Sequence, residues 1–306
     1  MEARRQFSRL GWAYVIFFLV STGMQLLTSA AAMALEYAGW GSINMDTAML
    51  LSQFSMYGIG FPVFYLLVRR IPAWKMVKPQ PMGTGQMILT MVFCFGMTYM
   101  GNLIGQLLMT AVGLFRGAVM ANPVDSLVLE MSPWAVFAST VLIAPVMEEL
   151  MFRKLLIDRV VQYGQKTAVI VSGVGFGLFH GNFFQFFYAC AIGMVFAYLY
   201  SSTGRIRYSI MLHMVINFVG GFVSLFLVQG LDHGQMWAVM GLGLQTILMI
   251  GSMISAIVLA CIYGKRLYWF PAWADSPERG IGRTVFLSPG ILGFLVMSVA
   301  LFVLGL

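Results

Sequence analysis

Five ionisable side chains stand inside stretches of this sequence that are otherwise apolar. Glu148 and Glu149 are adjacent acids in one such stretch, and Arg153 follows four residues after Glu149. His180 lies in a second apolar stretch and His213 in a third. An ionisable group inside an apolar span is costly, and those that persist usually face a cavity and take part in function. These five residues are therefore the first candidates for a functional site.

The spacing of the acids predicts two different roles. Residues four apart share a helix face, so Glu149 is placed to pair with Arg153. Glu148 is rotated by about 100° from its neighbour and has Phe152 at its i+4 position, which leaves it available as a general base toward water. The alternative is that both acids only pair with Arg153 and Lys154 at a helix end.

The segment before His180 has a regular pattern of small residues. Gly173, Gly177 and Gly181 recur at four-residue steps, which is typical of a smooth helix face that another helix approaches closely. Phe176 and His180 are expected at the edge of that face. The alternative role for this segment is packing alone, with the histidine bonded to a neighbouring helix.

His213 and Asn217 are four residues apart and so point the same way on a helix. An imidazole and a carboxamide together supply donors that can hold a polar oxygen, although a hydrogen-bonded pair between helices is an alternative. Helical rises from the expected inner boundaries put Glu148, His180 and Asn217 at a similar depth, about 10 to 20 Å below the inner surface. We therefore expect the three segments to meet in one inward-facing cavity.

The composition identifies the solvent in which these segments fold. Of 306 residues, 9% are charged and 60% are hydrophobic, with a mean hydropathy of +0.86. This excludes a water-soluble globule, a disordered chain and a disulfide scaffold. The net charge of +7 comes from cations spread between apolar stretches, which indicates orientation in a membrane and no nucleic-acid partner. We predict an all-α, polytopic bundle in the lipid bilayer.

Eight stretches are long enough to cross the hydrocarbon core, which takes roughly 20 helical residues. A ninth, 167–182, is shorter and rich in glycine, so we predict eight to nine transmembrane helices. The eight clear stretches are 11–35, 47–68, 86–115, 133–152, 186–203, 208–229, 236–263 and 284–306.

Charge asymmetry favours nine crossings with a cytoplasmic N-terminus. In that topology all of the 18 Lys and Arg residues except Arg116 lie in inner segments, as cytoplasmic loops of membrane proteins require. If the protein is bacterial, the expected location is the plasma membrane. The first span has a basic start and small residues near its end, so a secretory signal is an alternative. Its length and the later spans favour a retained helix.

Three motifs occur in order, each in a separate span, and their combination resembles one known family. This is the intramembrane endopeptidase family that includes CAAX prenyl proteases of the Rce type and bacterial Abi proteins, with the pattern EExxxR, FxxxH and HxxxN or HxxxB. The motifs in this chain are Glu148-Glu149-Leu-Met-Phe-Arg153, Phe176-Gly-Leu-Phe-His180 and His213-Met-Val-Ile-Asn217.

The resemblance covers roughly 133–220 and implies hydrolysis of a peptide bond at the membrane. It divides one continuous membrane domain into N-terminal helices (1–132), a CAAX-protease-like core (133–222) and C-terminal helices (223–306). The implied substrate is a membrane-associated protein or peptide, such as a prenylated C-terminus, a leader peptide or a pheromone precursor.

The resemblance also implies roles for the motif residues. Glu148 with His180 would activate water, and His213 with Asn217 would stabilise the oxyanion. Three further residues are expected to hold the catalytic side chains in position without contacting the substrate: Glu149, Arg153 and Phe176.

Three alternatives remain open at this stage. A metal-dependent form would hold one zinc ion on Glu148, His180 and His213 with a position left for water; we favour the metal-free form. A proton-coupled transporter could use the same ionisable groups, with Asn102 and Gln106 along its path. A non-catalytic membrane scaffold of the same fold is the third.

Overall fold

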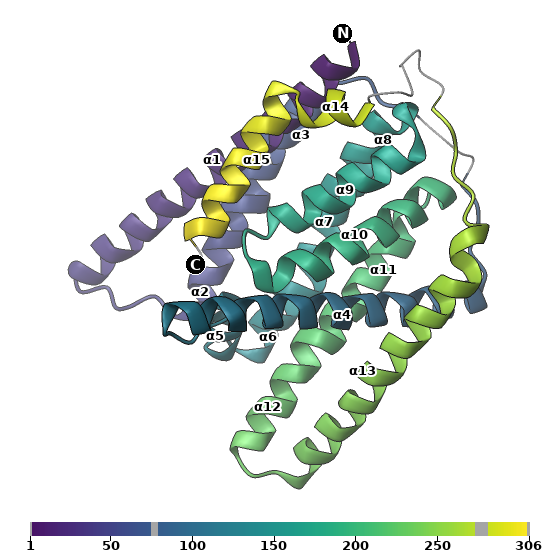
Figure 1. The fold of residues 1–306 in the computed structure, drawn as a ribbon. Coiled ribbons are helices and arrows are strands. Elements are labelled where there is room, and N and C mark those ends of the chain that lie inside the picture. Colours follow the sequence, from purple (N-terminus) through teal and green to yellow (C-terminus); the bar gives the residue numbers. More distant parts are fainter. Residues whose placement is uncertain (1, 75–78, 273–280, 305–306) are drawn as a thin grey trace.

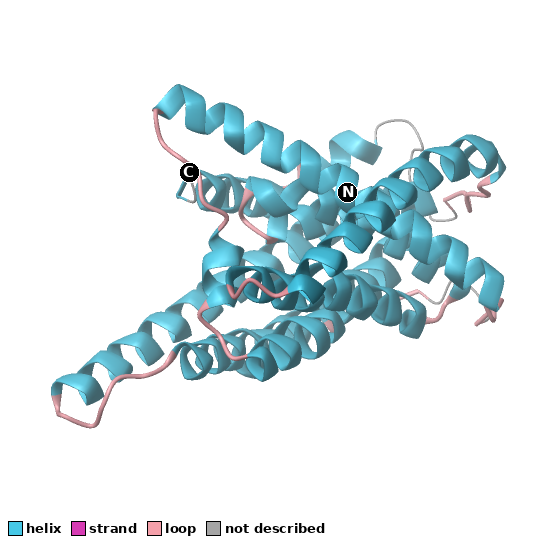
Figure 2. Ribbon diagram, turned by 90° about the horizontal axis from the view of Figure 1, so that it is seen from below, coloured by secondary structure: helices cyan, strands magenta, loops and turns pink. Residues whose placement is uncertain are grey.

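The computed structural model describes residues 2–74, 79–272 and 281–304, and all regular structure in these ranges is helical (Figures 1 and 2). The all-α prediction is therefore confirmed. Lys75, Lys78 and Arg279, which the charge pattern assigns to inner loops, lie outside the described residues.

The helices follow the apolar stretches of the sequence. The N-terminal part contains α1 (Glu2–Tyr37), then the stack α2 (Met45–Gln53), η1 (Phe54–Gly60) and α3 (Phe61–Val68), then α4 (Thr84–Arg116) and α5 (Pro123–Leu129). The fourth span is the stack α6 (Pro133–Val136), η2 (Phe137–Ile143), α7 (Ala144–Glu149), η3 (Leu150–Leu155), α8 (Leu156–Val160) and η4 (Val161–Tyr163). The rest is α9 (Gln165–Phe179), α10 (Phe183–Thr203), α11 (Ile206–Asn217), η5 (Phe218–Val223), α12 (Ser224–Asp232), α13 (Met236–Tyr263), η6 (Gly264–Arg266), α14 (Ile281–Phe286) and α15 (Pro289–Leu304).

Seven of these segments, in the described part of the chain, are long and apolar enough to cross a membrane. The shorter helices α9 and α15 are also apolar and correspond to the stretches 167–182 and 284–306. The protein is thus an integral membrane protein with several spans, while the total of eight to nine crossings remains a prediction.

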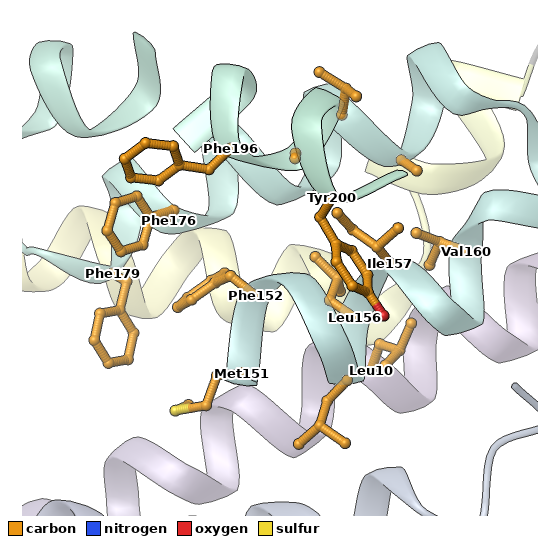
Figure 3. Packing of buried hydrophobic residues seen from close by; sticks show 14 of the residues in the cluster. Leu10, Met151, Phe152, Leu156, Ile157, Val160, Phe176, Phe179, Phe196 and Tyr200 are labelled. Carbon is orange, nitrogen blue, oxygen red and sulfur yellow. The ribbon is translucent and has the colours of Figure 1, made fainter. Parts of the chain in front are cut away.

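The centre of the bundle is formed by α7, α9, α10 and α11, with α1 and α15 packed together on one side (Figure 1). An aromatic core fills the space between them, and Figure 3 shows Phe152, Phe176 and Phe179 within it. Phe152 lies 5.3 Å from Phe176 and 5.2 Å from Phe179 between ring centroids. Edge-to-face rings at this spacing add to the stabilisation that burial provides.

Hydrogen bonds join the helix ends that the charge pattern assigns to the inner side. The Gln6 side chain donates to the Arg159 carbonyl at 2.7 Å and accepts from the Tyr163 hydroxyl at 2.7 Å. Arg159 Nε donates to the Val68 carbonyl at 2.8 Å. The start of the first span and the ends of the second and fourth therefore lie at one end of the bundle. Which side of the membrane that end faces remains a prediction.

The glycine pattern before His180 is confirmed at two positions and wrong at the third. A Cβ on Gly173 or Gly177 would meet Met194 or Cys190 of α10, so these glycines allow the close approach of α9 to α10. Gly181 instead has φ +64° and forms the turn between the two helices. Its missing side chain serves the backbone conformation rather than helix packing.

Alanine substitutions on two faces of α9 should separate packing from helix propensity. Gly177→Ala should lower the melting temperature, because the new methyl group would meet Cys190 and lie 2.9 Å from the Phe186 carbonyl oxygen; such overpacking costs about 1–3 kcal/mol. Gly175→Ala is the matched control, since its Cβ would meet only Phe152 at 3.7 Å. The control should melt at the same or a higher temperature in detergent. Equal melting temperatures for the two variants would contradict this packing.

Candidate active site

The two acids lie where the fourth span changes from an α-helix to a π-helix. Glu149 ends α7, and η3 begins at the next residue. Both residues are buried, but the side chain of Glu148 keeps 12% of its surface accessible while that of Glu149 keeps none. π-helical turns occur often at functional sites. The acids therefore differ in environment, as their spacing predicts.

Glu149 and Arg153 form the predicted ion pair inside the protein. Arg153 Nε lies 3.1 Å from Glu149 Oε2, and neither side chain is exposed. The guanidinium also lies over two aromatic rings, 4.6 Å from the centroid of Phe176 and 5.5 Å from that of Phe196; both rings are labelled in Figure 3. The aromatic faces attract the cation where water cannot solvate it.

His213 of α11 lies between the two acids. Its Nδ1 is 3.1 Å from Glu149 Oε1, and its Nε2 is 3.6 Å from Glu148 Oε2. Ser209, one turn earlier on α11, donates to the Ile206 carbonyl at 3.0 Å. Glu149 thus fixes the orientation of the imidazole, and the second ring nitrogen is directed at Glu148.

His180 joins the cluster through the ring of Phe176. The residue caps the C-terminus of α9, and its Nδ1 lies 2.9 Å from the Phe176 carbonyl oxygen. The Phe176 ring is nearly perpendicular to both imidazoles, at 4.8 Å from His180 and 5.6 Å from His213. Since Nδ1 donates to a carbonyl, Nε2 of His180 carries the lone pair.

Asn217 ends α11 and bonds to the start of the fourth span rather than to the other motif residues. Its Nδ2 donates to the Thr140 carbonyl at 2.8 Å. That carbonyl is available because η2 is a π-turn, in which the Ala144 N–H bonds to Ser139 in place of Thr140. The carboxamide has a second N–H on Nδ2, so one donor remains for a ligand.

Tyr57 of η1 is a site residue that the sequence analysis missed. Its hydroxyl hydrogen bonds to the Glu148 side chain, so the second span supplies one wall of the site. One signal was available in the sequence. Tyrosines of membrane proteins gather at the two interfaces, whereas Tyr57 lies in the middle of the candidate span Met45–Val68.

The proposed zinc ligands do not form a metal-binding group. Among the described residues, no three His, Cys, Asp or Glu side chains are arranged to hold a metal ion. The reason is local, because both ring nitrogens of His213 are directed at carboxylates. Glu148, His180 and His213 therefore do not fit a zinc site in this arrangement.

Comparisons with known proteins agree with the motifs. Residues 130–219 match the family model described as type II CAAX prenyl endopeptidase Rce1-like. Over 215 residues the chain is 24% identical to the "Putative membrane peptidase YdiL" of Bacillus subtilis (strain 168), which covers 67% of this chain and 85% of that protein. No solved structure matches the chain. The matched region contains all of the motif residues.

Glutamine substitutions of the adjacent acids should have unequal effects on stability. Glu149→Gln removes the partner of a fully buried guanidinium, and breaking such a pair costs about 3–5 kcal/mol. Glu148→Gln keeps a hydrogen-bonding group beside Tyr57 and should change the free energy of unfolding by less than about 1 kcal/mol. Thermal unfolding of the two purified variants in the same detergent measures the difference. Equal destabilisation would show that Glu149 does not carry the structural ion pair.

Proposed function

We propose that this chain, whose residues 130–219 match the family model described as type II CAAX prenyl endopeptidase Rce1-like, hydrolyses a peptide bond with a water molecule activated by Glu148. The observation that carries the proposal is the meeting of three motifs from separate spans. Glu148 Oε2 lies 3.6 Å from His213 Nε2, and Phe176 lies between His213 and His180.

Glu148 acts as the base and then as the acid. It takes a proton from water while the water oxygen bonds to the carbonyl carbon of the scissile peptide. The same proton then passes to the leaving nitrogen as the carbon–nitrogen bond breaks. Of the two adjacent acids, only Glu148 keeps an accessible surface, which supports its choice for this role.

His180 holds the water beside Glu148. Its Nδ1 bonds to the Phe176 carbonyl, so the lone pair of Nε2 accepts a hydrogen bond from the water and orients it for attack. The position of His180 at the end of α9, and not within the helix, leaves the ring room beside the Phe176 ring.

His213 and Asn217 stabilise the oxyanion. Nε2 of His213 and the second N–H of Asn217 Nδ2 are donors that a developing negative charge can use. Nδ1 of His213 donates a hydrogen bond to Glu149 Oε1 at 3.1 Å, and this bond sets the orientation of the imidazole ring. Nδ2 of Asn217 donates to the Thr140 carbonyl at 2.8 Å, and this bond sets the orientation of the carboxamide. Both donors are thus held by hydrogen bonds before the substrate arrives.

The charges of the cluster give His213 a second proton. Two carboxylates and the Arg153 guanidinium lie within the same buried group, and two negative charges against one positive charge leave one uncompensated. A second proton, on Nε2 of His213, neutralises the cluster and makes this nitrogen a donor. Because an isolated charge is costly in a low-dielectric interior, this proton stays on His213, and the proton that reaches the leaving nitrogen is the one that Glu148 takes from water.

The substrate is a membrane-associated protein or peptide. The matched family model is described as a prenyl endopeptidase, and the Bacillus subtilis relative is named as a putative membrane peptidase. We propose a peptide presented at the cytoplasmic face, with the N-terminus of the chain on the same side, and a prenylated C-terminus as the first class to test. A plasma-membrane location follows if the source is bacterial.

Replacing Glu148 by Gln should abolish hydrolysis while leaving the fold intact. Loss of a general base should lower the rate by about 10²–10⁴-fold, because the amide cannot accept the proton of water. The probe is an internally quenched peptide that ends in an S-farnesyl cysteine and three further residues, in proteoliposomes. Mass spectrometry of membrane peptides from cells with wild-type or Glu148→Gln protein extends the search to other substrates.

The same comparison separates the alternative functions. A proton-coupled transporter would show substrate-linked proton flux in liposomes that Glu148→Gln abolishes, with no new peptide termini in either sample. A non-catalytic scaffold would show no difference between wild type and variant. Either result would contradict the peptidase.

Replacing Asn217 by Leu should reduce turnover more than substrate binding. Loss of one oxyanion donor lowers kcat by about 10²–10³-fold, while KM should change by less than about threefold. Steady-state kinetics on the same peptide measure both constants. Thr140→Val is the matched control, since it retains the backbone carbonyl that Asn217 contacts, and its kcat should stay near the wild-type value. A change in KM alone for Asn217→Leu would contradict the oxyanion role.

A further inference from the structure

Gln53 is a buried polar residue that no part of the proposed mechanism uses. It ends α2 and is 7% exposed. Its side-chain oxygen Oε1 is buried and has no hydrogen-bond partner among the described residues. An unpaired carbonyl inside an apolar span raises the free energy of the folded state. A polar group retained under these conditions is explained by a ligand that pairs with it.

Helical spacing places Gln53 on the face of the second span that lines the site. Met49, Gln53 and Tyr57 follow at four-residue steps, and the change to a π-turn at Phe54 brings residues four apart closer to alignment. Tyr57 bonds to Glu148. Met49 packs against the cluster of Met131, Val136 and Leu225, and α2 contacts α6 and η2 of the fourth span. Gln53 lies between them and so faces the same span.

The level of Gln53 along the fourth span is that of the oxyanion donors. Met49 packs against the cluster that contains Val136, and Tyr57 lies beside Glu148, so the two spans run in the same direction. The midpoint between Val136 and Glu148 falls within Thr140–Ala144, and α2 contacts η2 directly. Asn217 bonds to the Thr140 carbonyl. The unpaired Oε1 and the Asn217 carboxamide therefore lie at a similar level of the fourth span, on α2 and α11, which both contact η2.

We propose that Gln53 is a substrate-binding residue whose Oε1 accepts a hydrogen bond from a main-chain N–H next to the scissile bond. The proposal rests on the peptidase function. A peptide drawn into the membrane must pair its N–H groups with protein, because lipid offers no acceptor. Oε1 of Gln53 is such an acceptor, and Asn217 and His213 supply the donors for the carbonyl oxygen. One side chain thus fixes the direction of the substrate main chain across Glu148.

Gln53→Met tests the acceptor without emptying the space that the side chain fills. The variant should raise KM for the farnesylated peptide by about three- to tenfold, the effect of one neutral hydrogen bond, with kcat within about twofold. The melting temperature without substrate should be unchanged or higher, because an unpaired buried carbonyl has been removed. Gln53→Glu retains an acceptor oxygen and should keep KM closer to the wild-type value. A lower melting temperature with an unchanged KM would show that Gln53 is structural and would overturn the proposal.

N-methylated peptides identify the donor. Methyl groups are placed one at a time on the amide nitrogens that flank the scissile bond, and each peptide is assayed with wild type and Gln53→Met. At one position the methyl group should lower kcat/KM of the wild type by about three- to tenfold and have no further effect on the variant. Identical effects on both proteins at every position would overturn the proposal. This is also the result expected if Oε1 bonds to a water molecule and not to the substrate.

Different results would contradict the peptidase function and the substrate-binding role of Gln53. No cleavage of any tested peptide by the wild type, together with unchanged membrane peptides in cells, contradicts the peptidase itself. Cleavage by the wild type at the same KM as Gln53→Met contradicts only the role of Gln53.

Discussion

The buried ion pair between Glu149 and Arg153 is the interaction on which the rest of the site depends. Neither charge reaches solvent, and either one alone would be costly at this depth. Their partners come from different spans, because Glu149 contacts His213 of α11 and Arg153 lies over Phe176 of α9 and Phe196 of α10. One salt bridge therefore ties four helical segments into a fixed arrangement, and Glu148 is positioned as the neighbour of that bridge.

Departures from the regular α-helix supply much of the remaining geometry. The described residues include π-helical segments η1, η2, η3 and η5, and each one contains or adjoins a residue of the site. A π-turn shifts the backbone hydrogen bonds by one residue, which frees the Thr140 carbonyl for Asn217. It also changes the direction of the side chains that follow. The helices of the bundle are thus interrupted where polar side chains must converge, while the packing faces of α9 and α10 remain regular.

The parts of the fold that depend on hydrophobicity and short-range spacing could be predicted from the sequence. The apolar stretches are helical in the structure, and Glu149 and Arg153, which are four residues apart, form an ion pair. Contacts between distant segments could not be predicted in this way. The bond from Tyr57 to Glu148 depends on how the second span packs against the fourth. The four-residue spacing alone places Gly181 on a packing face of α9. In the structure Gly181 lies in the tight turn before α10, and that turn determines its conformation.

The two adjacent acids show how the structure separates stability from reactivity over a single peptide bond. Glu149 has its carboxylate held by a guanidinium and an imidazole, so a proton cannot move there without breaking the ion pair. Glu148 has an accessible edge and two partners that tolerate a change of charge, the Tyr57 hydroxyl and Nε2 of His213. A base must change its charge in every catalytic cycle. Adjacent positions on one helix can meet both demands because the helix turns the two glutamates toward different neighbours.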